Sequence, residues 1–132
     1  MSRPNISDSA QVTAIDHRTA DVTIDRNWSP SHFTNLGASG AVVFTLPQDA
    51  KGGEVFKFTV LAAQSLRIDP GAAGAIYGHN GDAFAKQTDD KYIASSAVGA
   101  TVCLTSLGNG DWIAEQSAVI ESDGFEFDTV QG

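Results

Sequence analysis

The segment EVFKFTVLA constrains the fold more than any other part of the chain, because its side chains alternate in character. Phe56, Phe58 and Val60 occupy every second position, and the polar residues Lys57 and Thr59 lie between them. Successive side chains of a β-strand point to opposite faces, so this period of two indicates a strand with one buried and one solvated face. No window of eleven or more residues repeats apolar positions convincingly at helical spacing. The pattern therefore predicts an all-β protein.

Short strand-like segments recur along the chain and are separated by turn residues. AVVFTL stops at Pro47, and SLRID stops at Pro70. Residues 100–116, ATVCLTSLGNGDWIAEQ, alternate, turn at Gly-Asn-Gly and alternate again, which is typical of a β-hairpin. About ten short strands, spaced by roughly 8 to 12 residues, predict a β-sandwich or a jelly-roll-like barrel of antiparallel strands.

The length of 132 residues suits a single domain, and the two ends differ from the middle. We expect an N-terminal arm over residues 1–9, which are polar, and a β-sandwich or barrel domain over residues 10–116. Residues 117–132 are acidic, yet Phe125 and Phe127 alternate with the acids. Two interpretations of this segment stay open: an arm that adds to a neighbour, or the last strand or a frayed tail of the same domain.

The net charge limits the classes of molecule that the chain is expected to bind. Sixteen acidic residues and eight basic ones give a net charge of −8. Binding to nucleic acid requires a basic surface, as does attraction to an anionic membrane, so neither partner is expected. No apolar run approaches the roughly 20 residues of a membrane span. Because the first residues lack an apolar signal core, we expect the chain to be made and used without export.

Chemistry-bearing residues are present but form no recognisable catalytic pattern. His17, His32 and His79 lack metal-ligand spacing. His79 precedes Asp82 in GHNGD, which allows either a base or metal site or an ordinary surface loop. Cys103 lies in an apolar run and is expected to be a small buried hydrophobe. The sequence predicts a non-enzymatic protein with no catalytic residue, no metal and no cofactor.

Two longer segments carry a resemblance. TLPQDAKGGEVFKFTVLAAQSLRIDPGAAGAIYG followed by VGATVCLTSLGNGDWIAEQ resembles a recurring module of tailed-bacteriophage structural proteins, over residues 32–114. In that module a strand ends in Leu-Pro, a glycine loop leads to a strand with alternating aromatics, and a glycine-rich hairpin leads to a tryptophan strand. The matching positions are Leu46, Pro47, Gly53, Phe56, Phe58, Ile68, Ile76, Gly78, Gly99, Leu104, Gly110 and Trp112.

The resemblance implies a function as well as a fold. Such modules are similar to capsid decoration (cement) proteins and to domains of head or tail fibres, which tend to be β-sandwiches or jelly rolls that assemble as trimers. The chain has no long repetitive shaft and no coiled-coil heptads, which favours the decoration protein. The resemblance thus implies a homotrimer on the outer capsid surface of a virion, bound to the major capsid protein and made in the host cytoplasm.

Two other functions stay open. The chain could be an adhesion domain of a head or tail fibre that binds glycans on the host surface, and exposed aromatic residues would then cluster on one face. A small hydrolase would depend on His79 or Asp82, but the sequence suggests no reaction for it.

The residues that we expect at a protein interface are aromatic. Aromatic side chains anchor interfaces when they are not part of the core. The candidates are Trp28, Phe33, Phe125 and Phe127.

Overall fold

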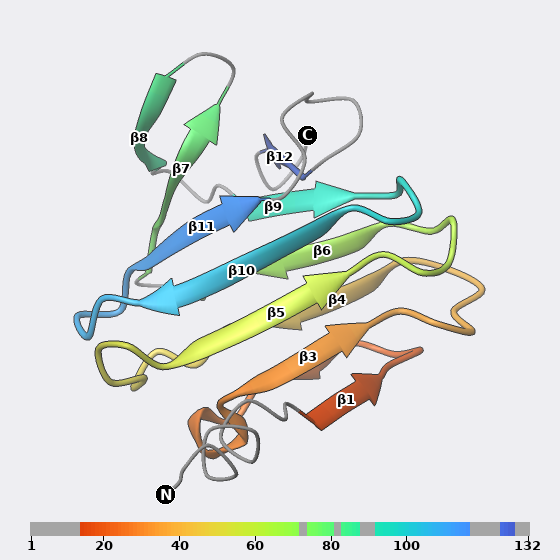
Figure 1. Ribbon diagram of the computed structural model, residues 1–132, viewed down its shortest axis with the longest axis horizontal. Helices are drawn as coiled ribbons and strands as arrows, with labels where there is room; N and C mark the ends of the chain where they lie inside the picture. Colours follow the sequence, from red (N-terminus) through yellow and green to blue (C-terminus); the bar gives the residue numbers. More distant parts are fainter. Residues whose placement is uncertain (1–13, 72–73, 81–82, 88–91, 117–124, 129–132) are drawn as a thin grey trace, which may run out of the picture.

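The chain forms two facing β-sheets with no α-helix among the described residues. The computed structural model describes residues 14–71, 74–80, 83–87, 92–116 and 125–128. Sheet A has seven strands in the order β1 (Ala14–His17), β3 (Ser31–Thr34), β5 (Val55–Thr59), β10 (Thr101–Ser106), β11 (Trp112–Gln116), β7 (Ile76–Asn80) and β8 (Ala83–Gln87). Sheet B has five strands in the order β12 (Glu126–Asp128), β9 (Tyr92–Ser95), β6 (Leu66–Asp69), β4 (Val42–Thr45) and β2 (Val22–Thr23). The predicted all-β sandwich is confirmed (Figure 1), and because both sheets are open, the fold is not a closed barrel.

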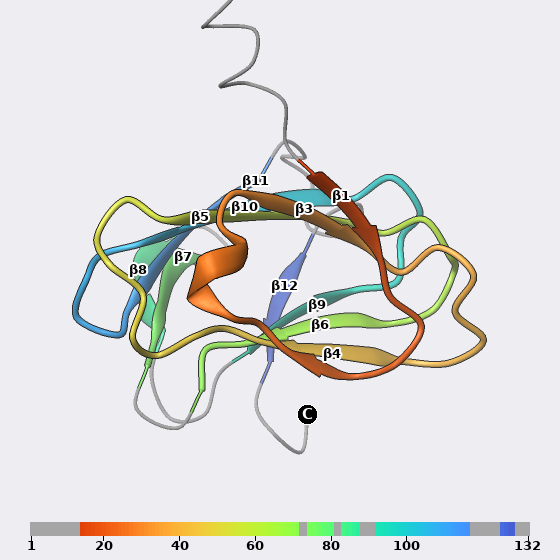
Figure 2. The same cartoon turned by 90° about the horizontal axis from the view of Figure 1, so that it is seen from below.

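The expectation of purely antiparallel strands is wrong, because the chain alternates between the two sheets from β1 to β6. Strands β1, β3 and β5 follow one another in sheet A, and their neighbouring pairs are parallel. Strands β2, β4 and β6 do the same in sheet B. Each connection therefore crosses to the opposite sheet instead of turning back within one sheet (Figure 2). Glycine and proline in these connections mark the ends of strands, but they do not indicate which sheet receives the next strand.

Antiparallel pairs predominate in the second half of the chain, although β7 and β11 pair in parallel. The hairpin of β10 and β11 forms where the sequence predicts it, and Trp112 begins the return strand opposite Ser106. Gly108 and Gly110 adopt φ angles of 89° and 93°, which L-residues with a side chain rarely adopt. Strand β10 also pairs with β5, so the hairpin continues the parallel group β1-β3-β5 across sheet A.

Aromatic side chains fill the space between the sheets. Phe33 is the centre of this cluster, since its ring centroid lies 5.3 Å from that of Phe44, 5.6 Å from that of Phe58 and 6.1 Å from that of Phe56. Phe56 in turn lies 6.0 Å from Trp112. All five side chains are fully buried. In β5 the alternation confirms the sequence prediction, with Phe56 and Phe58 in the core and Lys57 exposed.

A short 3-10 helix, η1 (Arg26–Trp28), closes the sandwich at the edge formed by β1 and β2 (Figure 2). Asp25 caps this helix by accepting a hydrogen bond of 2.8 Å from the backbone N–H of Asn27. Trp28 then packs its ring 6.4 Å from that of Phe33. The guanidinium group of Arg18 lies 5.3 Å from the centroid of the Trp28 ring and forms an ion pair with Asp16.

The C-terminal segment supplies one strand of the same domain. Strand β12 pairs with β9 in an antiparallel register, with Phe127 opposite Ile93. Phe125 precedes the strand and is 2 % exposed, and its backbone N–H and C=O both bond to the side-chain amide of Gln116. Of the two interpretations of residues 117–132, the structure gives the last strand for Glu126–Asp128. The expected arm of residues 1–9 lies outside the described residues, as do residues 117–124 and 129–132.

Candidate functional site

The outer face of sheet A presents a polar row that crosses five strands. Strand register places Ile15, His32, Lys57, Cys103 and Glu115 side by side, from β1 through β3, β5 and β10 to β11. The alternate positions of β3, β5 and β10 enter the core, so these side chains must face outward. In the part of the chain that the structure describes, Lys57 forms no ion pair.

A second row on the same face is held by hydrogen bonds between side chains. His32 Nε2 lies 2.6 Å from Thr59 Oγ1, which lies 3.1 Å from Thr101 Oγ1. His17 Nδ1 lies 2.5 Å from Thr34 Oγ1. Partial burial lowers the pKa of His32 below its usual value of 6.5, and the nearby positive charges of Lys57 and His17 lower it further. His32 is therefore neutral at pH 7.

Protonation of His32 should destabilise the fold at acid pH. Because its pKa is lower in the folded chain, the unfolded chain takes up a proton first, and stability is lost as the pH falls below about 6.5. We expect urea unfolding midpoints to fall between about pH 7.5 and about pH 5.5, and to fall less in His32→Gln, which keeps a partner for Thr59 but does not titrate. Equal pH dependence in the two proteins would contradict this assignment.

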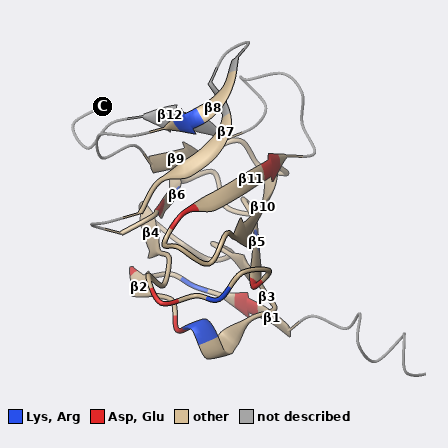
Figure 3. Ribbon diagram, turned by 90° about the vertical axis from the view of Figure 1, so that its left-hand side faces the viewer, with Lys and Arg blue, Asp and Glu red and all other residues tan. Residues whose placement is uncertain are grey.

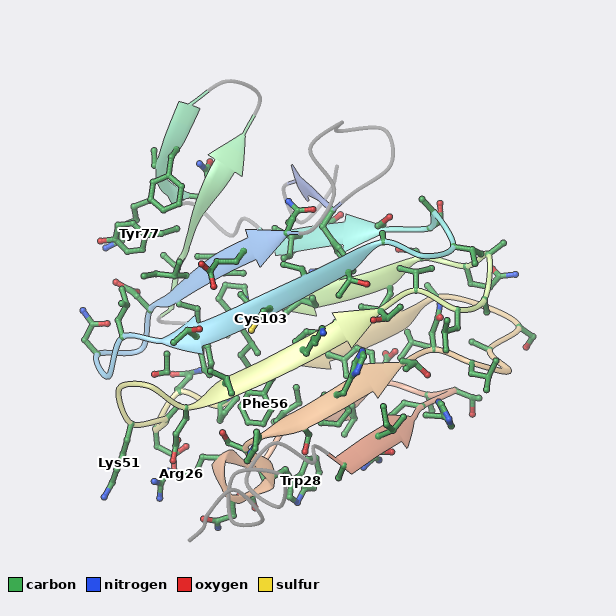
Figure 4. All side chains as sticks on the ribbon, viewed as in Figure 1. Arg26, Trp28, Lys51, Phe56, Tyr77 and Cys103 are labelled. Atoms are coloured by element: carbon green, nitrogen blue, oxygen red, sulfur yellow. The ribbon has the colours of Figure 1, made fainter. Side chains whose placement is uncertain are left out.

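Cys103 is neither buried in the core nor activated. It is half-buried on the outer face of sheet A (Figure 4), because its neighbours Val102 and Leu104 take the inward positions of β10. The expectation that Cys103 is a buried hydrophobe is thus corrected. Partial burial raises the pKa of the thiol, and the charge of Glu115 raises it further, so little thiolate is present at neutral pH.

A different surface, formed by three loops, lies at one end of the sandwich. We call it the loop end and define it as residues 35–41, 60–65 and 96–100. These segments follow β3, follow β5 and precede β10, which are neighbours in sheet A, and they lie together on the right of Figure 1. None of the three segments contains Asp, Glu, Lys, Arg or His.

Each loop of the loop end exposes one large apolar side chain. Leu36 is 47 % exposed, Leu61 39 % and Val98 61 %. Neighbouring strands lie about 4.8 Å apart, so the three loops that carry these side chains lie side by side. In the same loops three alanines turn inward: Ala38 is part of the core, and Ala62 and Ala97 pack against it. The loops are therefore anchored while their larger side chains face solvent.

Asn35 holds two of these loops together. Its side chain is fully buried, and Nδ2 donates hydrogen bonds of 3.1 Å to the carbonyl oxygens of Ala62 and Gln64. Its Oδ1 accepts bonds of 2.8 Å and 2.9 Å from the backbone N–H groups of Leu61 and Ala62. All four hydrogen-bonding positions of the amide are used. The third loop is fixed by the Gly99 N–H, which donates to the carbonyl oxygen of Val60 at 2.8 Å.

The opposite end of the sandwich is charged. Arg26 forms an ion pair of 2.8 Å with Glu54, and Lys51 donates its backbone N–H to the same carboxylate. Figure 3, which looks onto this end, shows acidic and basic residues in its loops, and Figure 4 labels Arg26 and Lys51 there. A groove lined by residues 23–26 and 45–49 opens at this end as well. Within the described residues no group of three or more His, Cys, Asp or Glu side chains could hold a metal ion.

The four aromatic candidates do not share one surface. Trp28 is 38 % exposed, at the edge near β1. Phe33 and Phe125 are buried in the core, so the exposure expected of them is corrected: both fill the space between the sheets. Phe127 lies on β12, where the structure defines the backbone but not the side chain.

The sites proposed for the two other functions are not assembled by the described residues. Trp28 and Phe84 are the aromatic side chains that the described surface exposes most, and they lie at opposite edges of sheet A. The described side chains therefore form no aromatic face for a glycan. For the hydrolase, His79 lies on β7, while Asp82 lies outside the described residues.

The loop end was missed by sequence reasoning. A signal was present, because the three loops are free of charge and each carries a leucine or valine among mostly small residues. Exposed apolar residues that occur singly are ordinary, so each loop alone predicts nothing. Only the order of β3, β5 and β10 in sheet A brings the three loops together.

Comparison with known proteins adds no family. No protein-family model matches the chain, and no curated protein matches it significantly. In the described part of the chain, no helix has the length and hydropathy that crossing a membrane requires.

Proposed function

We propose that the chain is a non-enzymatic virion protein that binds the outside of a tailed-phage capsid and stabilises it as a decoration protein. In this proposal the protein forms a homotrimer, and its partner is the major capsid protein. The resemblance to phage modules suggests that the particle is the head of a tailed phage. The confirmed β-sandwich is the kind of fold that the resemblance implies.

The loop end is the observation that carries the proposal, because an assembly on a shell requires lasting contacts between protein subunits. It offers an apolar, uncharged surface whose loops are already fixed by Asn35 and by backbone hydrogen bonds. A fixed surface loses little conformational entropy on binding, which favours a lasting protein contact. When one oligomer binds a shell at several points, its avidity exceeds the affinity of a single contact by about 10² to 10⁴. These features suit a structural role on a particle.

The excess of acidic residues is compatible with close packing of many copies on a shell. The net charge of −8 gives every copy the same sign, and like charge keeps neighbouring copies from precipitating on one another. The charged end of the sandwich, with Arg26 and Glu54, would then face solvent or a polar part of the shell.

Immunogold electron microscopy of a phage lysate, with an antibody against this chain, tests the proposal. We expect gold particles spread evenly over the heads. Gold confined to tails or to one vertex would replace the decoration protein by a fibre domain. Unlabelled particles, with the chain detected elsewhere in the lysate, would show that the resemblance is misleading and that the proposal is wrong.

A further inference from the structure

We infer that the loop end binds a second copy of this chain, so that it is the surface of self-association and not the surface that contacts the shell. The inference takes from the proposed function only that the loop end binds protein. The charge and the shape of the three loops indicate that the protein bound there is a second copy.

Charge is the first argument for a second copy. Each copy has a net charge of −8, so two copies in contact repel each other. This repulsion is smallest where the contact surface carries no charge. The three segments of the loop end contain no ionisable side chain. A partner with a different, charged surface is recognised by complementary charges, and the loop end offers none.

Among the described residues, a charged connection lies beside the loop end, and its charged side chains are already paired within the chain. Residues 18–21 link β1 to β2 beside the loop end and include Arg18 and Asp21. The Arg18 guanidinium stacks on Trp28 and pairs with Asp16 at 2.9 Å. Asp21 Oδ1 accepts a hydrogen bond of 2.9 Å from the backbone N–H of Val43. Both side chains thus have partners within the chain.

Shape is the second argument. Apart from Leu36, Leu61 and Val98, the exposed residues of the loops are mostly small, such as Gly40 and Ala63, so a neighbouring backbone can approach closely. Contacts between identical chains are more apolar than contacts between unlike chains. Repetition of one patch around a symmetry axis also closes the assembly and leaves no patch open.

Two matched leucines allow a direct test. Leu61 is 39 % exposed in the loop end, and Leu107 is 41 % exposed in the turn between β10 and β11, at the opposite end. In both residues a backbone N–H is bonded within the chain, to Asn35 Oδ1 and to the Asp111 carbonyl oxygen respectively. An aspartate at either position keeps a similar degree of exposure and adds the same charge.

The experiment measures the mass of the purified full-length chain by light scattering over a range of concentrations. We expect wild type and Leu107→Asp to associate to the same multiple of 13.8 kDa. In Leu61→Asp and Val98→Asp, like charges would face each other across the contact, and the dissociation constant should rise about 100-fold or more. Circular dichroism and thermal unfolding of each variant establish that the fold is retained.

The salt dependence of self-association is a second, independent measurement. Added salt screens the repulsion between acidic copies, so self-association through an uncharged patch should strengthen or stay constant as salt increases. Association that weakens with salt would instead indicate a contact between opposite charges, and would overturn the inference.

Other outcomes separate this inference from the proposed function. A monomeric wild type, or an oligomer that survives both Leu61→Asp and Val98→Asp, overturns the inference. If such an oligomer no longer binds undecorated phage heads, the loop end contacts the shell, and the proposed function stands without the inference. If wild type associates through the loop end but never binds heads, the inference stands and the proposed function fails.

Discussion

Phe33→Ala is expected to lower the free energy of unfolding by about 4 kcal/mol, as measured by urea denaturation of the purified chain. The side chain has no exposed surface, and four aromatic rings have their centroids within 6.4 Å of its own. Phe33 comes from sheet A and Phe44 from sheet B, so the truncation leaves a cavity between the two layers. Stabilities of single domains are about 5–15 kcal/mol, and the variant should therefore be close to unfolding at 37 °C.

Trp28→Ala is the matched comparison. Trp28 touches the same cluster, but it is 38 % exposed, and the surface of its ring contacts Arg18. Its removal should cost only about 1 to 2 kcal/mol, because less surface is buried and solvent can fill the space. A smaller loss for Phe33→Ala than for Trp28→Ala would contradict the burial of Phe33. It would also return Phe33 to the list of interface candidates.

Local pattern was sufficient to predict the strands but not their connections. The alternation of Phe56 and Phe58 with Lys57 identifies a strand with one buried face, and the glycines around Asn109 identify the hairpin. The local sequence of a connection does not show whether it turns back within one sheet or crosses to the other. The parallel pairs among β1 to β6 were therefore missed. Pairing between strands distant in sequence is decided by the packing of the whole core.

The surfaces were harder to predict than the strands because exposure depends on both sheets. Phe33 and Phe125 are aromatic, as interface anchors often are, yet both are buried in the core. Cys103 looked buried in an apolar run, and the pleat turns it outward. The charge-free loops could be read from the sequence, but their meeting at one end depends on strand order, which the sequence did not reveal.

Asn35→Ala is expected to lower the free energy of unfolding by about 3 kcal/mol, although it removes no charge and little apolar surface. The substitution deletes four hydrogen bonds at once and leaves the backbone N–H groups of Leu61 and Ala62 without their acceptor. A buried polar group that loses its partner costs about 1–3 kcal/mol, and entry of water recovers part of that cost. Urea denaturation measures the loss, and a change below about 1 kcal/mol would contradict the role of Asn35.

Asn35→Asp separates hydrogen bonding from side-chain volume, because aspartate is nearly isosteric with asparagine. It keeps both acceptor positions for the N–H groups of Leu61 and Ala62, but it cannot donate to the carbonyl oxygens of Ala62 and Gln64 while it is ionised. Burial disfavours its charge, so the variant should regain stability on acidification, when the protonated acid again donates one bond. Stability that instead falls on acidification as steeply as in wild type would exclude this account.

The position of Asn35 also connects the fold to the proposed surface. It contacts no partner itself, yet it fixes the loop that carries Leu61 beside the loop that carries Leu36. In Asn35→Ala, we expect amide hydrogen exchange to accelerate at Leu61 and Ala62 more than in β5, because those two N–H groups lose their acceptor. Self-association should weaken together with this local protection. If association were unchanged while the loop exchanged freely, the apolar side chains would not need to be fixed in place, and rigidity of the loop end would play no part in binding.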